Sequence, residues 1–467
     1  MAIKLSPFFF WVEWVKKIVW DPFWWVIFMA AVFFVPFLRV WWWLFAPLAL
    51  YIQLKIVYLW WLRWDYYYEY PRTKWTVLEI TPPKEILAPL KAMEDFFSVI
   101  WGPVYDVANW RERWCEGELD NAPYWMSCEI VSIEGKIHFY LRVMTNHRSA
   151  IESALYAHYP DMEISEVSDY VKEVPHNIPN EEWDLYGEEF VLNNPAPYPI
   201  KTYEKFFEPQ GEKISAEEKR IDPINSLLDS MSRLGTGEQF WLQLIVMAAG
   251  DYDEPEFKKE AERIISRKAR RPVKKSEGII EKIIEDIVAV INMLIGGLST
   301  GTAPEKAKYT KSDEGEREMV LTPGEREIIS EIENKIKKPI FRAVLRGMYV
   351  AKRDNWNASN RIHSRSYFSH FTSNNLNSLR FTNTTRTRVH FVLRKRRVFL
   401  RARRMMRNAV LRFTPLFPDR RRECPILNTE ELATLFHFPL KATGSMLPSI
   451  TVVESKKGGP PANLPME

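Results

Sequence analysis

Apolar and polar positions recur with two different periods through residues 75–167. A period of two is typical of half-buried strands, and a period near 3.6 is typical of helices. Six segments carry these patterns in the order strand, helix, strand, strand, helix, strand: 75–81, 85–101, 124–133, 136–144, 151–159 and 162–167. Glu134-Gly135 predicts a tight turn between the central pair of strands, and Asn146 can cap the second helix. The order β-α-β-β-α-β is the ferredoxin-like arrangement.

A second set of elements of similar order is predicted to begin near Phe190. Asp222-Pro223 opens a helix, because an acidic cap followed by proline is typical of a helix start. The run at 237–248 is apolar on both faces, which predicts a central and buried strand. Thr322 begins a further helix through a capping box with Glu325. A strand at 339–350 ends this second α+β unit.

The N-terminal residues form a long apolar run. From Pro22 to Leu62 the clearly polar or charged residues are Arg39, Gln53 and Lys55, and a membrane-spanning helix needs about 20 apolar residues. Basic residues flank this run on both sides, and Trp and Tyr gather at its end, as at a membrane interface. We expect an inner-membrane (cytoplasmic-membrane) protein with one or two spanning helices and a soluble body in the cytoplasm. A pair of aromatic-rich, buried core helices is the alternative.

With 467 residues the chain is too long for a single ordinary domain. The expected fold class is α+β, with an N-terminal transmembrane anchor, two ferredoxin-like (βαββαβ-type) modules and a basic C-terminal helical segment. The expected parts are the anchor at 1–70, modules at 71–185 and 186–355 with a helical insertion near 250–321 in the second, the basic segment at 356–425, and a tail with a short partner-binding helix at 426–467.

Basic charge is concentrated in one segment. Residues 380–422 hold fifteen Arg and Lys against one Asp, whereas the whole chain has a net charge of +4. Apolar residues recur at helical spacing among the arginines, so we expect a basic amphipathic helix with Phe399 on its apolar stripe. Anionic lipid, nucleic acid and an acidic protein surface are the three partners considered. The residues expected to contact them are Arg394, Arg396, Arg397, Arg401, Arg403, Arg404 and Arg407.

Motifs for catalysis are scarce. The chain contains no GxxxxGK[ST] string for nucleotide phosphates and no HExxH string for zinc, and its three cysteines form no CxxC pair. We therefore expect a protein that is not an enzyme and that has no cofactor and no metal site.

A resemblance to a known family begins at the C-terminus. The strings LNTEELATLFHFP and VVESKKGGPPANLPME resemble the segment that precedes the ATPase core in bacterial conjugative, type IV secretion coupling-protein-like DNA pumps. KEILAPLKAMEDFFSVIWG and TPGEREIISEIENKI, with the aromatic N-terminus, resemble uncharacterised bacterial membrane proteins associated with such ATPases. The nucleotide-binding motifs of the ATPase core are missing from this chain.

The resemblance implies a non-catalytic, membrane-anchored subunit of a DNA-transfer machine, with the P-loop ATPase supplied in trans. A homo-oligomer is expected. The alternative is a membrane-surface scaffold or a nucleic-acid-tethering protein unrelated to secretion. The tail helix would bind the ATPase through an amphipathic face. Its apolar residues are Leu432, Leu435, Phe436 and Phe438.

Overall fold

The structure is a computed structural model that describes part of the chain. The described residues are 30, 34, 74–83, 86, 90–104, 125–206, 222–249, 253–269, 321–390, 393–412, 424–439 and 450. The chain divides into two compact units, and all the elements below, apart from Trp75 itself, belong to the unit formed by Thr76–Val107 and Pro123–Glu467.

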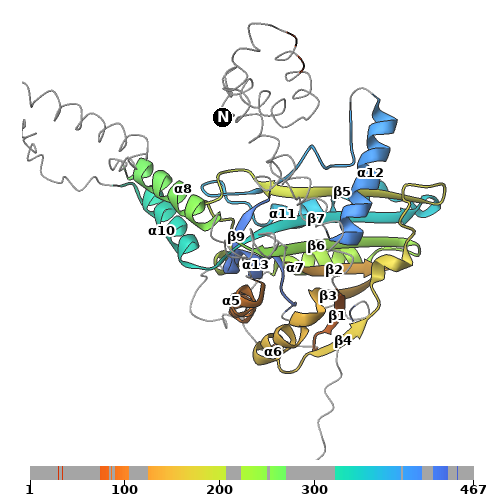
Figure 1. Cartoon of the computed structure of the whole chain (residues 1–467), viewed down its shortest axis with the longest axis horizontal. Helices are drawn as coiled ribbons and strands as arrows, with labels where there is room; N and C mark the ends of the chain where they lie inside the picture. The colour runs from red at the N-terminus through yellow and green to blue at the C-terminus, as the bar shows by residue number, and fades with distance from the viewer. Residues whose placement is uncertain are drawn as a thin grey trace, which may run out of the picture. The chain divides into compact units, whose positions relative to one another are not determined.

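One mostly antiparallel sheet of nine strands forms the centre of the described part (Figure 1). Its strands are β1 (Trp75–Thr81), β2 (Trp125–Ile133), β3 (Lys136–Met144), β4 (Glu163–Val167), β5 (Trp183–Leu192), β6 (Glu238–Ala248), β7 (Ile340–Lys352), β8 (Leu379–Phe381) and β9 (Ile426–Asn428). They lie in the order β4-β1-β3-β2-β6-β7-β5-β8, and β9 pairs with β7.

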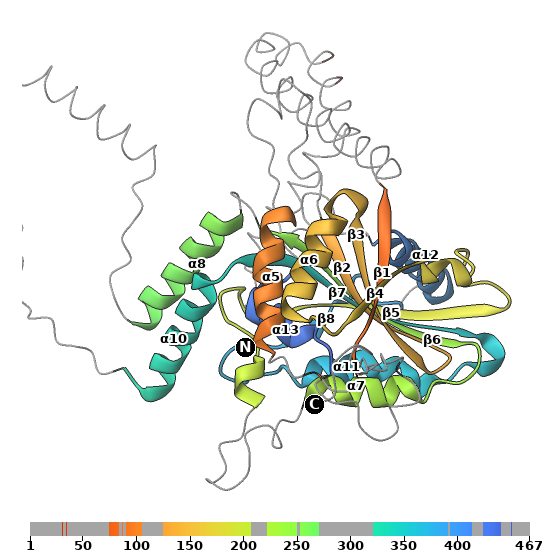
Figure 2. The same ribbon diagram turned by 90° about the horizontal axis from the view of Figure 1, so that it is seen from below.

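Helices cover the two faces of this sheet unequally (Figures 1 and 2). The α-helices are α5 (Lys91–Val104), α6 (Arg148–His158), α7 (Pro223–Ser232), α8 (Asp253–Lys268), α10 (Pro323–Lys337), α11 (His363–Ser369), α12 (Arg394–Leu411) and α13 (Thr429–Leu435). Apolar residues of α5, α6, α7, α11 and α13 join the core on one face. Those of α12 join a smaller core on the other face.

The central strands are buried on both faces, as the sequence predicts for 237–248. Phe240, Leu242 and Leu244 of β6 join the larger core, whereas Trp241 between them joins the core under α12. Successive side chains of a strand point to opposite faces, so a continuous apolar run fills both cores. The prediction of a central and buried strand is confirmed.

Local signals at helix starts are confirmed at two positions and wrong at a third. Asp222 caps α7 by accepting a hydrogen bond from the Ile224 amide, and Thr322 and Glu325 form the capping box of α10. Asn146 does not cap α6, because it lies within a short 3-10 turn, and the cap position is taken by His147, whose side chain does not cap the helix.

The prediction of two ferredoxin-like modules is wrong, because the strands of both halves form a single sheet. Strands β2 and β6 pair along nine positions, from Trp125↔Met247 to Ile133↔Gln239, and so join the two halves. The two halves of the sheet, β1–β4 and β5–β8, repeat one strand order: β4-β1-β3-β2 in the first half and β8-β5-β7-β6 in the second. Strand β5 crosses the boundary expected at 185/186. Strands β2 and β6 are buried along almost their whole length, so pairing them satisfies backbone groups that two separate modules would leave open at a sheet edge.

The predictions of a transmembrane anchor and of an inner-membrane location are also corrected. Among the residues that the structure describes, none of the helices combines the length and the apolar character needed to cross a membrane. The anchor was expected at 1–70, where the described residues are Ala30 and Phe34. We therefore withdraw the membrane and transmembrane descriptions of the chain.

Candidate anion-binding surface on helix α12

The basic amphipathic helix predicted from the sequence is α12, and it lies close against the sheet (Figure 1). Ala402, Met405, Met406 and Ala409 are at most 2 % exposed and pack on the core that contains Trp241. The approach is close over β5, where a Cβ added to Gly187 would lie 2.6 Å from Met405 Cγ. Only glycine leaves room for the helix at this point.

The cations of α12 lie mainly on its outer side. At about 100° per residue, positions 396, 403, 404 and 407 lie opposite the buried residues. No ion pair joins the exposed cations to an acidic side chain within the described part of the chain. The exposed cations are Arg394, Lys395, Arg396, Arg397, Arg403, Arg404 and Arg407.

Arg401 is the one predicted contact residue that the structure places differently. Its side chain is half-buried and donates from Nη1 to the carbonyls of Asn383 and Arg386, at 2.8 and 2.9 Å. Burial, and then the like charges of Arg397 and Arg404, lower the pKa of the Arg401 guanidinium. Burial is the larger cause of the shift, and the neighbouring arginines add to it.

Phe399 lies outside the buried stripe to which the sequence assigns it. Its side chain is 43 % exposed, and the next residue, Leu400, is 54 % exposed. The Arg403 guanidinium carbon lies 5.0 Å from the centroid of the Phe399 ring. The buried stripe begins at Ala402, because the first turns of α12 extend past β5, where the sheet no longer covers them (Figure 1).

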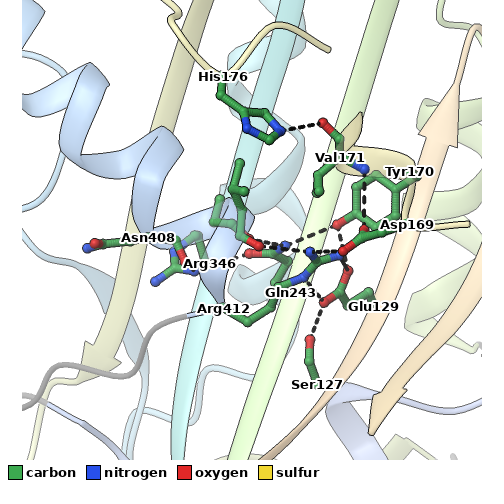
Figure 3. A network of polar contacts seen from close by, with 12 residues as sticks. Ser127, Glu129, Asp169, Tyr170, Val171, His176, Gln243, Arg346, Asn408 and Arg412 are labelled. Carbon is green, nitrogen blue, oxygen red and sulfur yellow. Dashed lines mark hydrogen bonds and ion pairs between the residues drawn. The ribbon is translucent and has the colours of Figure 1, made fainter. Parts of the chain in front are cut away.

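A buried ion-pair network fixes the C-terminal end of α12 to the sheet (Figure 3). The guanidinium of Arg412 is inaccessible and donates to both oxygens of Glu129, at 2.9 and 3.1 Å, and to both oxygens of Asp169, at 2.7 and 2.8 Å. The Tyr170 hydroxyl donates to Glu129 Oε2 at 2.5 Å. Arg412 itself adopts a left-handed backbone conformation with φ of 50°. This conformation ends the helix and turns the side chain inward.

A second buried arginine, on the sheet, reaches the last turn of α12. Arg346 of β7 donates to Glu189 Oε1 at 2.8 Å, to Gln243 Oε1 at 3.1 Å and to the Asn408 carbonyl at 3.0 Å. Gln243 donates in turn to the Ala409 carbonyl at 3.2 Å. The last carbonyls of a helix have no partner within it, so these donors satisfy them and oppose the negative end of the helix dipole.

The opposite charges of Glu129 and Arg412 stabilise each other. Burial raises the pKa of the Glu129 carboxyl, but Arg412 outweighs burial and holds that pKa below its ordinary value. Burial and the Glu129 carboxylate together raise the pKa of the Tyr170 hydroxyl well above its ordinary value. Glu129 is therefore an anion at neutral pH, and Arg412 is its compensating cation.

The apolar residues of the tail helix are placed in the core rather than on the surface. Leu432, Leu435, Phe436 and Phe438 are all at most 2 % exposed. Phe438 packs edge to face on Phe139 of β3, with ring centroids 5.4 Å apart. The apolar face predicted to bind an ATPase is thus already covered by this chain's own strands and helices.

The sequence predicted neither half of this network, because the arginines that it singled out lie between positions 394 and 407, and Glu129, Arg346 and Arg412 were given no role. Glu129 stands in the middle of the apolar strand WMSCEIVSI, and Arg346 stands in VLRGMYV. A charged residue inside an apolar strand is a signal for a buried ion pair, because an unpaired charge there is very costly. The partner cannot be found from sequence, since Glu129 and Arg412 are 283 positions apart.

Comparisons with known proteins add no relative. No protein-family model matches the chain, and neither does any curated protein. The resemblance to proteins of DNA-transfer machines therefore stays a prediction.

Proposed function

We propose that this chain is a non-catalytic, nucleic-acid-binding subunit of a type IV secretion-like DNA-transfer machine, working with a P-loop ATPase supplied in trans. The proposal has two parts of different origin. Binding through α12 rests on the geometry of its arginines, whereas the DNA-transfer setting and the separate ATPase rest on the resemblance of the sequence.

The observation that carries the binding part is the row of exposed cations on α12, which form no ion pair with any acidic side chain that the structure describes. Each phosphate of a nucleic acid that meets such a cation releases condensed counterions, which favours binding without regard to sequence. Guanidinium groups suit phosphate because their donors match two of its oxygens. The buried network of Arg412 and Arg346 holds the helix in place, so its cations are positioned before a ligand arrives.

The binding test uses the full-length chain and fluorescently labelled DNA over a range of salt concentrations. We expect the logarithm of the binding constant to fall linearly with the logarithm of salt, with a slope of about 0.9 for each phosphate contact on duplex DNA. A variant with Gln at Arg396, Arg403, Arg404 and Arg407 should bind at least about tenfold more weakly and show a shallower slope.

Helix α8 supplies the matched control. It presents four exposed cations, but the acids of the sequence DEPEFKKEAERIISRK alternate with them. Gln at Lys258, Lys259, Arg263 and Arg267 removes the same charge from the chain as the α12 variant. If both variants lose the same affinity, binding follows net charge and the proposed role of α12 is wrong.

The alternative is a nucleic-acid-tethering protein unrelated to secretion, which would use the same surface of α12. The two functions differ in the need for a motor. If the neighbouring open reading frame encodes a P-loop ATPase that co-purifies with this chain, the DNA-transfer function is supported. A neighbouring ATPase that never co-purifies favours tethering.

A further inference from the structure

Exposed apolar side chains gather among the arginines at the start of α12. The described residues include seven large apolar side chains that are exposed, and three of them, Leu393, Phe399 and Leu400, lie within eight positions of one another. Their exposed fractions are 66 %, 43 % and 54 %. A surface that met phosphate alone would need only cations, so these side chains call for a ligand with an apolar part.

Phe399 is arranged as part of a stacking surface. The guanidinium of Arg403 lies over its ring, at 5.0 Å from the centroid. Arg396 and Arg403 stand one helical turn before and after it, and side chains at that spacing are neighbours on a helix surface. An aromatic ring with cations close to it is the combination on which unpaired bases stack, because the cations hold the backbone while the ring contacts a base.

We propose that α12 prefers single-stranded over double-stranded nucleic acid, with a base stacked on Phe399 and adjacent phosphates held by Arg396, Arg403 and Arg404. This inference rests on the proposed function, because it names the ligand of the same surface. In a duplex the bases are stacked on one another and cannot reach a side chain on a helix surface without unpairing. An acidic peptide would match the charge of the surface but offers no base to stack on the ring.

The test compares three probes of equal length on the full-length chain: oligo-dT, an abasic strand with the same phosphates, and a duplex. We expect oligo-dT to bind at least about fivefold more tightly than the abasic strand, since stacking of one base on an aromatic ring has about that effect or more. Phe399→Ala should remove this difference, because oligo-dT then loses far more affinity than the abasic strand. Phe399→Tyr keeps a ring and should retain the difference.

Tyr156 on α6 provides the matched control, because it is also an aromatic residue with 43 % of its side chain exposed. Tyr156→Ala should leave the preference for oligo-dT intact. The comparison of oligo-dT with the abasic strand needs no variant at all, so it holds even if a substitution disturbs folding.

Binding of the three probes distinguishes failure of the stacking role of Phe399 from failure of the proposed function. Equal binding of oligo-dT, the abasic strand and the duplex would overturn the stacking role of Phe399 and leave phosphate binding intact. Failure to bind any of the three at low salt would overturn the proposed function as well. Tighter binding of polyglutamate than of oligo-dT would assign the surface to an acidic protein and overturn both.

Discussion

At the scale of single residues, the chain uses its arginines in two opposite ways. Arg412 and Arg346 are buried and paired, and they hold α12 on the sheet. Arg396, Arg403 and Arg407 are exposed and unpaired within the described part, which leaves them available to a ligand. The count of basic residues in the sequence cannot separate these groups, because burial depends on which distant strand carries the carboxylate.

Removal of Arg412 should destabilise the fold more than most single changes. In Arg412→Met the carboxylate of Glu129 stays buried without its cation, and breaking a buried pair on one side costs about 3–5 kcal/mol. The double variant Arg412→Met with Glu129→Gln removes both charges and should recover part of that loss. Urea unfolding of the two variants and the native chain measures the difference. A loss below about 1 kcal/mol in Arg412→Met would mean that the pair is solvated rather than buried.

His437 makes the stability of the chain depend on pH. Its Nδ1 faces the Ala433 carbonyl at 2.9 Å and its Nε2 faces Asp222 Oδ1 at 2.8 Å, so both ring nitrogens face acceptors. Burial lowers the pKa of this histidine, but the Asp222 carboxylate outweighs burial and raises that pKa above its ordinary value. A raised pKa in the folded state stabilises fully below the ordinary value near 6.5, and this stabilisation is lost as pH rises through the folded value.

We therefore expect the free energy of unfolding to fall between pH 6 and the folded pKa by an amount that depends on His437. His437→Gln can keep the hydrogen bond to Asp222 but cannot titrate, so the difference between it and the native chain should shrink as pH rises. Urea unfolding at several pH values measures this difference. A difference that stays constant with pH would show that the pKa of His437 is the same in the folded and unfolded states, and a difference that grows as pH rises would show that the folded state lowers this pKa.

At the scale of elements, sequence patterns predict where helices and strands lie, but not how they meet. The alternation in 136–144 and the turn at Glu134-Gly135 are local signals, and the hairpin of β2 and β3 is confirmed. Phe399 is exposed and the apolar residues of the tail helix are buried, and the sequence pattern predicts neither for the same reason. Helical spacing shows that one face is apolar, but it does not show where the sheet ends under α12 or that α13 covers the core.

At the scale of the whole molecule, the continuous sheet should make the two halves unfold together. Nine residue pairs between β2 and β6 carry the apolar core from one half into the other. A core that spans both halves leaves neither half with a complete core of its own, so the loss of one exposes apolar surface of the other. The described part should therefore behave as one cooperative unit.

Matched core substitutions in the two halves test this cooperativity. Leu155 of α6 and Leu227 of α7 are each 1 % exposed, and replacement of either by Ala should cost about 2–5 kcal/mol. Hydrogen exchange measured by mass spectrometry reports on the slow amides of β1 and β7 separately. In one cooperative unit, Leu155→Ala accelerates exchange in β7 as well as in β1, and Leu227→Ala does the same in reverse. Exchange that accelerates only in the half that carries the substitution would contradict this prediction. The pairing of β2 with β6 would then not couple the two halves, and each half would fold as an independent module within the shared sheet.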